Sequence, residues 1–124
     1  MLKPVKFAIA MALPLVFSCG ILAQNQTVVY AKVFSVQSLS GIVQDEAGKP
    51  IRGAKVEELT DGWKATLSVV LTDEKGFFLI QTHQRHTLHY LRFTMPNFNP
   101  VLIKVRASRW ARKKSLSISL PVAN

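Results

Sequence analysis

The segment from Ser40 to Val56 constrains the fold most, because it contains a strand pattern, a tight-turn pattern and a second strand pattern. Apolar and polar residues alternate on both sides of the turn Asp45–Pro50, as they do in half-buried strands. Gly48 permits a left-handed turn conformation, and Pro50 cannot donate to a central ladder. The segment therefore predicts a β-hairpin.

A second segment of the same kind, Thr72–Phe78, turns at Asp73–Gly76 and predicts another hairpin. We expect about seven short strands at regular spacing and no amphipathic helix after the N-terminal region, which indicates an all-β, Greek-key β-sandwich. In the strand expected at 65–72, three apolar residues share one face: Leu67, Val69 and Leu71. The residues expected to point into the core are Val43, Ala54, Val56, Phe78, Ile80, Leu91, Phe93, Val101, Ile103, Val105, Leu116, Ile118 and Leu120, and Phe98 is expected to close one end of the core.

Residues 1–23 have the pattern of a signal peptide, including its helix, with basic Lys3 and Lys6 before an apolar run. Cleavage after Ala23 would begin the mature chain at 24. We expect residues 24–37 to be a linker or a loose first strand, and residues 38–124 to form the sandwich domain. The predicted location is outside the cytoplasm, either periplasmic or secreted.

Two alternatives for the N-terminal region remain open. Cys19 is the single cysteine and follows Val16-Phe17-Ser18, which is similar to a bacterial lipobox, so the chain could be a lipoprotein anchored through Cys19. The uncharged run up to Ala23 could instead remain as an uncleaved membrane anchor. A mature chain that begins at residue 24 would contain no cysteine and therefore no disulfide.

The charge is distributed unevenly along the chain. The sequence has 16 Lys and Arg against 7 Asp and Glu, a formal net charge of +9, and every acidic residue lies at or before Glu74. The basic C-terminal half favours acidic partners such as an anionic polysaccharide or a lipid surface. Nucleic acid is not expected as a partner of an exported chain.

The turn and strand residues resemble the carboxypeptidase regulatory-like domain, a family with a transthyretin-like (prealbumin-like) β-sandwich. The matching residues are Gly41, Val43, Asp45, Gly48, Pro50, Ile51, Gly53, Ala54, Val56, Thr72, Asp73, Gly76 and Phe78. The run Leu91–Phe98 resembles a later strand and turn of the family, with Asn97 where the family usually has glycine. The resemblance implies a non-catalytic module that serves in folding, spacing or binding.

The basic loop between the last two strands is the strongest candidate for a binding site. Its residues are Arg106, Arg109, Trp110, Arg112, Lys113 and Lys114. Arginine binds carboxylate, sulfate or phosphate in bidentate fashion, and an exposed tryptophan stacks on sugars or enters a lipid interface. The alternative is a solvated hairpin with Trp110 folded back over the sandwich edge.

Other chemistry has weaker support in the sequence. His83, His86 and His89 are weak candidates for a metal site, and the alternative is that they lie on a solvated hairpin tip without a metal. Asp45 and Asp73 are expected to form turns. No nucleophile-elbow pattern is present, and the C-terminal Tyr-Arg-Gly-Ser signature of transthyretin-like hydrolases is missing. We therefore predict no cofactor and no catalytic residues.

The sequence thus predicts a non-catalytic exported binding or scaffold module that contacts an envelope protein or an anionic glycan. One alternative is a small transthyretin-like hydrolase that acts at an oligomer interface. Another is a structural role through strand-edge pairing, for which the outward-facing apolar residues Ile42, Phe77 and Leu102 are candidates.

Overall fold

The computed structural model describes residues 26–81 and 88–123, and these residues form eight β-strands. The strands are β1 (Val28–Val36), β2 (Ser40–Asp45), β3 (Lys55–Leu59), β4 (Thr66–Leu71), β5 (Phe77–Leu79), β6 (Leu88–Thr94), β7 (Val101–Ala107) and β8 (Leu116–Leu120). Within the described ranges, no helix has the length and hydropathy to cross a bilayer. The expected signal peptide and Cys19 lie outside the described residues.

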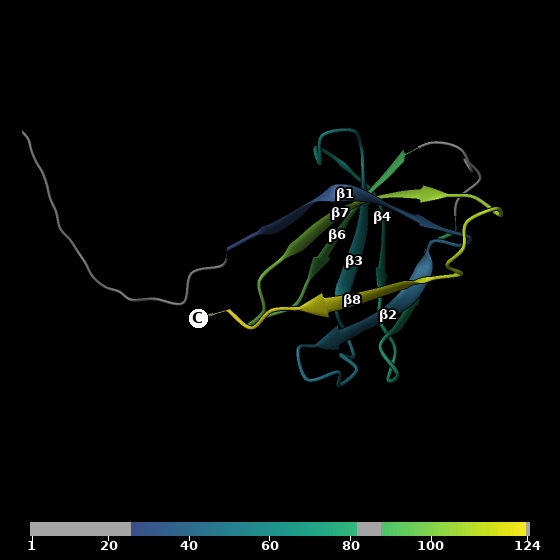
Figure 1. Cartoon of the computed structure of the whole chain (residues 1–124). Coiled ribbons are helices and arrows are strands. Elements are labelled where there is room, and N and C mark those ends of the chain that lie inside the picture. Colours follow the sequence, from purple (N-terminus) through teal and green to yellow (C-terminus); the bar gives the residue numbers. More distant parts are fainter. Residues whose placement is uncertain (1–25, 82–87, 124) are drawn as a thin grey trace, which may run out of the picture.

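The strands form two sheets. Five strands are arranged in the order β1-β7-β6-β3-β4, and three in the order β5-β2-β8. Figure 1 shows the smaller sheet packed across one face of the larger one. The predicted all-β sandwich is therefore confirmed, with eight strands in place of the expected seven or so.

The core lies between the two sheets, and it consists of the side chains that alternate inward along each strand. The thirteen residues predicted to point into the core are buried, whereas Phe98, predicted to close one end of it, is half-buried and packs against it. Phe78 from the smaller sheet and Phe93 from the larger one meet edge to face, with ring centroids 5.4 Å apart. This pair connects the two layers of the sandwich.

The two predicted turns are present, and an aspartate organises each of them. The Asp45 carboxylate accepts hydrogen bonds from the backbone N–H groups of Ala47 and Lys49, at 2.9 and 2.8 Å. Asp73 accepts equivalent bonds from Lys75 and Phe77, both at 2.9 Å. Both aspartates are therefore turn formers, as predicted.

The predicted hairpins are confirmed only beside the turns, where the Ile51 N–H donates to the Val43 carbonyl at 2.9 Å and the Asp73 N–H donates to the Phe77 carbonyl at 3.0 Å. The strands on either side of each turn do not pair with each other. β2 and β3 follow each other around the Asp45–Pro50 turn but belong to different sheets, and so do β4 and β5 around the second turn. Strand alternation and turn residues are the same whether the chain returns to its own sheet or crosses to the opposite one. The turns here are corners of the sandwich, and the strand that pairs with β2 on one side is β5.

The described part of the expected linker, residues 26–37, is mostly strand. β1 runs from Val28 to Val36 and pairs in parallel with β7, so the linker interpretation is wrong and the strand interpretation is correct. Parallel strands need no local turn between them, because a long connection joins them. The sequence around β1 therefore carries no turn signal that would reveal its partner.

β4 presents its apolar face to solvent. Leu67, Val69 and Leu71 share one face as expected, and that face is 62%, 49% and 64% exposed, respectively. Its other face, which carries Ser68 and Val70, is half-buried. Val70 packs against the core. The face of β4 that carries Ser68 and Val70 is therefore the one that points inward.

Gly41 marks a close approach of two strands in the smaller sheet. It pairs with Leu116, the first residue of β8. A β-carbon at Gly41 would overlap the carbonyl oxygen of Leu116 and lie 2.7 Å from its carbonyl carbon. Only glycine leaves room for β8 at this point, so Gly41 fixes the position of the strand that forms one wall of the candidate site.

Candidate functional site

The candidate site is a groove along one open side of the sandwich, between β1 and β8. These strands are edges of the two different sheets, and Figure 1 shows them on the same side of the molecule. They meet at one end, where the N–H of Gln37 donates to the carbonyl of Lys113 at 2.9 Å. An isolated bridge between Val36 and Lys113 closes that end. Beyond it the strands separate and leave the groove.

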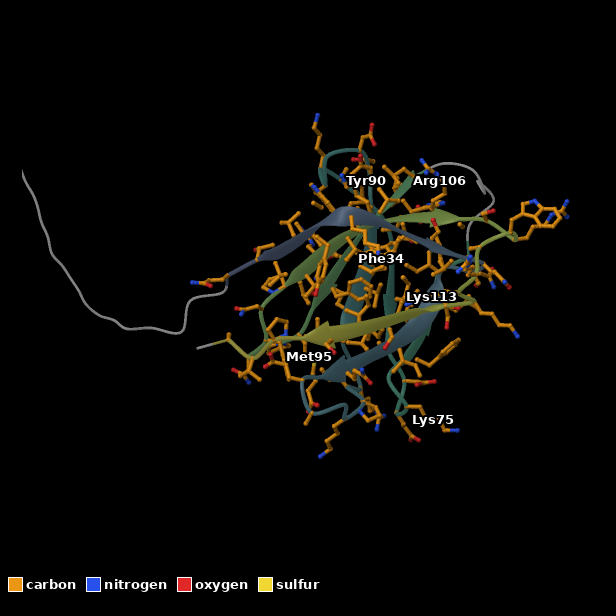
Figure 2. All side chains as sticks on the ribbon, in the orientation of Figure 1. Phe34, Lys75, Tyr90, Met95, Arg106 and Lys113 are labelled. Carbon is orange, nitrogen blue, oxygen red and sulfur yellow. The ribbon has the colours of Figure 1, made fainter. Side chains whose placement is uncertain are left out.

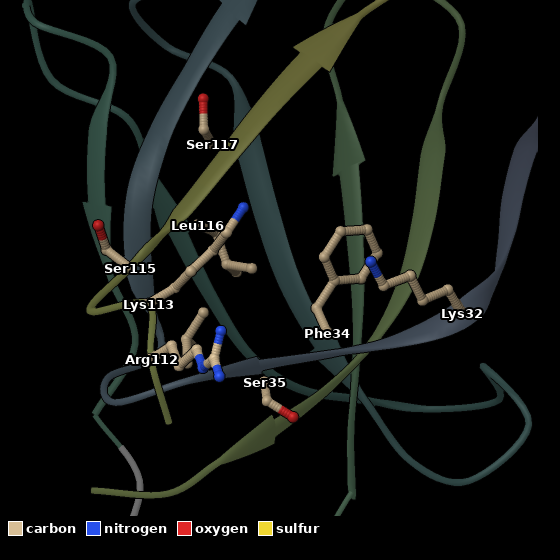
Figure 3. A pocket seen from close by; sticks show the side chains of 9 residues that line it. Lys32, Phe34, Ser35, Arg112, Lys113, Ser115, Leu116 and Ser117 are labelled. Carbon is tan, nitrogen blue, oxygen red and sulfur yellow. The ribbon is translucent and has the colours of Figure 1, made fainter. Parts of the chain in front are cut away.

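The groove contains a cavity of about 330 Å³ next to the closed end. Figure 3 shows Phe34 on one side of it and Lys113 with Leu116 on the other. Its lining residues are Lys32, Phe34, Ser35, Val36, Arg112, Lys113, Ser115, Leu116 and Ser117. Three of them are cations, and none is a carboxylate, so the cavity is suited to an anionic group.

The β1 wall is built by the alternation of that strand. Phe34 pairs with Val105, whose side chain is in the core, so the Phe34 ring points to the inner side of the sheet. Lys32 lies on the same side, with its ammonium 5.9 Å from the Phe34 ring centroid. The ring of Tyr30 meets Phe34 edge to face at 5.7 Å. The wall thus combines two aromatic rings with one cation.

The opposite wall is formed by β8 and the chain segment that leads into it. Arg112 and Lys113 reach the cavity from this segment, and the buried side chain of Leu116 closes its floor. Ser117 and Ser119 are exposed on the outer face of β8. Because serine is small, the main chain of β8 remains accessible from the groove.

A second hollow of about 220 Å³ extends the groove toward its open end. Its lining residues are Tyr30, Phe34, Ser117, Ile118 and Ser119. Phe34 and Ser117 line both hollows, so the two form one continuous groove. The first hollow is cationic and the second is aromatic and polar, which suits an elongated ligand with an anionic part.

The structure divides the six predicted residues of the basic loop. Arg112 and Lys113 line the cavity, whereas Lys114 is exposed beside it and Arg106 is exposed on β7, where it pairs with Ser35. Figure 2 shows Phe34 and Lys113 close to each other, with Arg106 farther away. The six predicted residues therefore do not form one cluster, and only two of them line the cavity.

Trp110 projects into solvent at the tip of the loop. It is 81% exposed, and the Arg109 guanidinium lies 5.1 Å from its ring centroid. The expectation that Trp110 folds back over the sandwich edge is therefore wrong, whereas the expectation of a solvated loop is correct. β7 and β8 belong to different sheets, so the loop is a connection between layers.

The histidine prediction fails at the one histidine that the structure describes. His83 and His86 lie outside the described residues, whereas His89 is on β6 and only 3% exposed. Its Nδ1 lies 2.7 Å from the Glu58 carboxylate, so a hairpin-tip position is wrong for His89. Across residues 26–81 and 88–123, no group of three potential metal-binding side chains occurs.

Two consecutive glutamates of β3 face opposite sides of the larger sheet. Glu58 pairs with core residue Leu91 and points inward to His89, whereas Glu57 points outward to Arg92. Arg92 donates to Glu57 through Nε at 2.9 Å and Nη2 at 3.1 Å. Both carboxylates are engaged with a basic side chain, so they form no carboxylate pair for acid–base chemistry.

The Glu57–Arg92 pair makes stability depend on pH. The hydrogen bonds from Arg92 hold the pKa of Glu57 below its ordinary value, although burial opposes this effect. A carboxyl group with a lowered folded-state pKa stabilises the fold above its unfolded pKa, and this contribution disappears as pH falls through the folded value.

Glu57→Gln should therefore lower the free energy of unfolding by about 1 to 2 kcal/mol at neutral pH. Urea titrations of the protein and the variant at pH 7 and about pH 3 measure this, and the difference should shrink at the lower pH. A difference that stays constant between the two pH values would contradict the role of the ionised carboxylate.

Sequence reasoning missed Lys32, Phe34 and Tyr30, which form the β1 wall. The available signal is their alternation, since Tyr30, Lys32, Phe34 and Val36 occupy every second position of a segment rich in β-forming residues. That pattern predicts one face, but it does not indicate that this face meets β8.

Comparison with known proteins leaves the family of this chain open. No protein-family model matches the sequence. No curated protein sequence matches it either. Among solved structures, the chain is similar to the 3-chlorocatechol 1,2-dioxygenase of Rhodococcus opacus 1CP, with a TM-score of 0.48 and 10% identity over 86% of this chain and 69% of that one. The chlorocatechol 1,2-dioxygenase of Pseudomonas putida gives a TM-score of 0.42 and 9% identity over 88% and 69%. These values assign no activity to this chain.

Proposed function

We propose that this chain is a non-catalytic exported binding module of the carboxypeptidase regulatory-like type, and that its β1–β8 groove binds an anionic partner in the cell envelope. The observation that carries the proposal is the convergence of Lys32, Arg112 and Lys113 on one cavity without a lining carboxylate. Cations that lack a counter-charge attract an anionic ligand and bind it through charge-assisted hydrogen bonds.

The location outside the cytoplasm rests on the signal-peptide pattern of residues 1–23. In that setting the anionic partner is an acidic envelope protein or an anionic glycan. The Phe34 and Tyr30 rings offer apolar surface beside the cations. Either a protein side chain or a sugar ring can pack on such a surface.

The non-catalytic part of the proposal rests on where the titratable groups lie. The His89–Glu58 pair resembles part of a hydrolytic site in its residue types, but His89 is buried on the inner face of the larger sheet. A general base must reach the proton that it removes. A histidine in this position serves packing and hydrogen bonding.

Heparin, a sulfated glycan, is a suitable probe of the groove. The double variant Arg112→Ala/Lys113→Ala should bind heparin about tenfold more weakly than the parent protein at about 0.1 M salt, because two partly exposed charge pairs are lost. Titration calorimetry measures the affinity, and raising the salt should reduce the difference between the two proteins.

The matched control is Lys49→Ala/Lys75→Ala, which removes the same charge from two turns outside the groove. Figure 2 shows Lys75 far from Phe34 and Lys113. Control binding close to that of the parent supports the groove. An equal loss in both double variants would mean that heparin senses only net charge, and the proposed site would be wrong.

A further inference from the structure

The groove is bordered by two strand edges that carry backbone hydrogen-bonding groups. β8 pairs with β2 on one side, and β1 pairs with β7. Among the described residues, the opposite edges of β1 and β8 meet only at the Val36–Lys113 bridge. An edge of this kind presents a row of N–H and C=O groups to any extended chain that reaches it.

The β8 edge lacks the devices that usually prevent such pairing. Exposed edge strands are commonly protected by lysine, proline or a bulge. The five residues Leu116–Leu120 include none of these residue types, and their register with β2 is regular. Ser117 and Ser119 are exposed but small, so they leave the main chain open to a partner.

We propose that an extended acidic segment of a partner protein binds in the groove as an added strand along β8. This inference rests on the proposed function and specifies its ligand as a polypeptide. Main-chain hydrogen bonds to β8 would supply affinity, and alternating side chains would supply specificity. The positive lining of the cavity selects acidic residues.

The two walls define the side-chain pattern of the bound segment. Alternate residues of a strand point to opposite sides. One set faces Phe34 and Leu116 at the floor of the groove and must be apolar. The other set points away from the floor, where the long, exposed side chains of Lys32, Arg112 and Lys113 can extend to it, and must be acidic. The segment therefore alternates acidic and apolar residues over about the five residues that β8 offers.

Synthetic peptides test the proposal. The capped peptide Asp-Val-Asp-Val-Asp should bind the purified protein, and the peptide Lys-Val-Lys-Val-Lys should not. Two further peptides are N-methylated forms of the aspartate peptide, one methylated at every aspartate nitrogen and the other at every valine nitrogen. Their charge and apolarity are nearly identical. Each of them blocks the hydrogen bonds along a different edge of the extended peptide. Strand addition requires one of the two to bind about tenfold more weakly than the other.

The protein side is tested by charge reversal. Lys32→Glu/Lys113→Glu should abolish binding of the aspartate peptide and allow binding of the lysine peptide, whereas Lys49→Glu/Lys75→Glu should change neither. Circular dichroism confirms that both variants are folded. Persistence of aspartate-peptide binding in the groove variant would overturn the proposal.

The remaining outcomes separate this inference from the proposed function. If heparin binds in the groove but both N-methyl peptides bind as well as the parent peptide, anion binding stands and strand addition is wrong. If neither heparin nor the aspartate peptide binds, both proposals fail. If the protein alone sediments as a dimer that Ser117→Lys disrupts, β8 pairs with a second copy, and an acidic partner segment is the wrong occupant.

Discussion

Gly41→Ala is expected to destabilise the protein by about 3 kcal/mol or more, because the added methyl group would overlap the backbone of β8. The affected atoms are the carbonyl carbon and oxygen of Leu116, which cannot move away by a change of rotamer. β8 would have to separate from β2, and the floor of the groove would move with it. Urea unfolding followed by tryptophan fluorescence measures the loss.

Gly48→Ala is the matched control for this prediction. Gly48 has φ +86°, and a β-carbon there has no neighbour within 4 Å. Its substitution costs only the strain of a left-handed alanine, about 1 kcal/mol. Similar losses at both positions would show that Gly41 is required for its conformation and not for the close approach of β8.

Phe93→Ala is expected to lower the free energy of unfolding by about 4 kcal/mol. The ring is fully buried, and its removal leaves a cavity and ends the edge-to-face contact with Phe78. A domain of this size has a total stability of about 5 to 15 kcal/mol, so the loss removes a large share of it and the thermal midpoint should fall. Thermal unfolding by circular dichroism measures the shift in midpoint.

Phe77→Ala removes the same atoms from an exposed position on β5, which is 43% exposed. It should cost less than about 1 kcal/mol, because little buried area is lost. A loss at Phe77 as large as that at Phe93 would mean that the outer face of the smaller sheet is covered in solution, for example by another protein molecule.

Much of the sandwich follows from the sequence, because its signals are local. Leu116, Ile118 and Leu120 alternate with serines, and all three are buried as that alternation requires. Asp45 and Asp73 precede glycines by three residues, and both form the expected turns. Period-two alternation and turn chemistry depend only on neighbouring residues, so they need no knowledge of the partner strands.

The features that the sequence did not predict all depend on distant partners. The choice of sheet at each corner, the parallel pairing of β1 with β7 and the meeting of Glu58 with His89 join segments without a shared local pattern. The groove belongs to the same group. Arg112 and Lys113 were predicted as binding residues. Lys32 and Phe34 line the same cavity only because β1 lies opposite β8.

The parallel pairings have a consequence for the time at which the chain can fold. β1 and β2 are synthesised early, yet each takes its parallel partner from the C-terminal part of the chain, β7 and β8. Contacts of such long sequence separation form slowly, because a large loop must close first. On the ribosome the larger sheet therefore stays incomplete until β7 emerges, and the smaller sheet until β8 emerges. A polypeptide of this design therefore keeps unpaired strand edges on β1 and β2 through most of its translation.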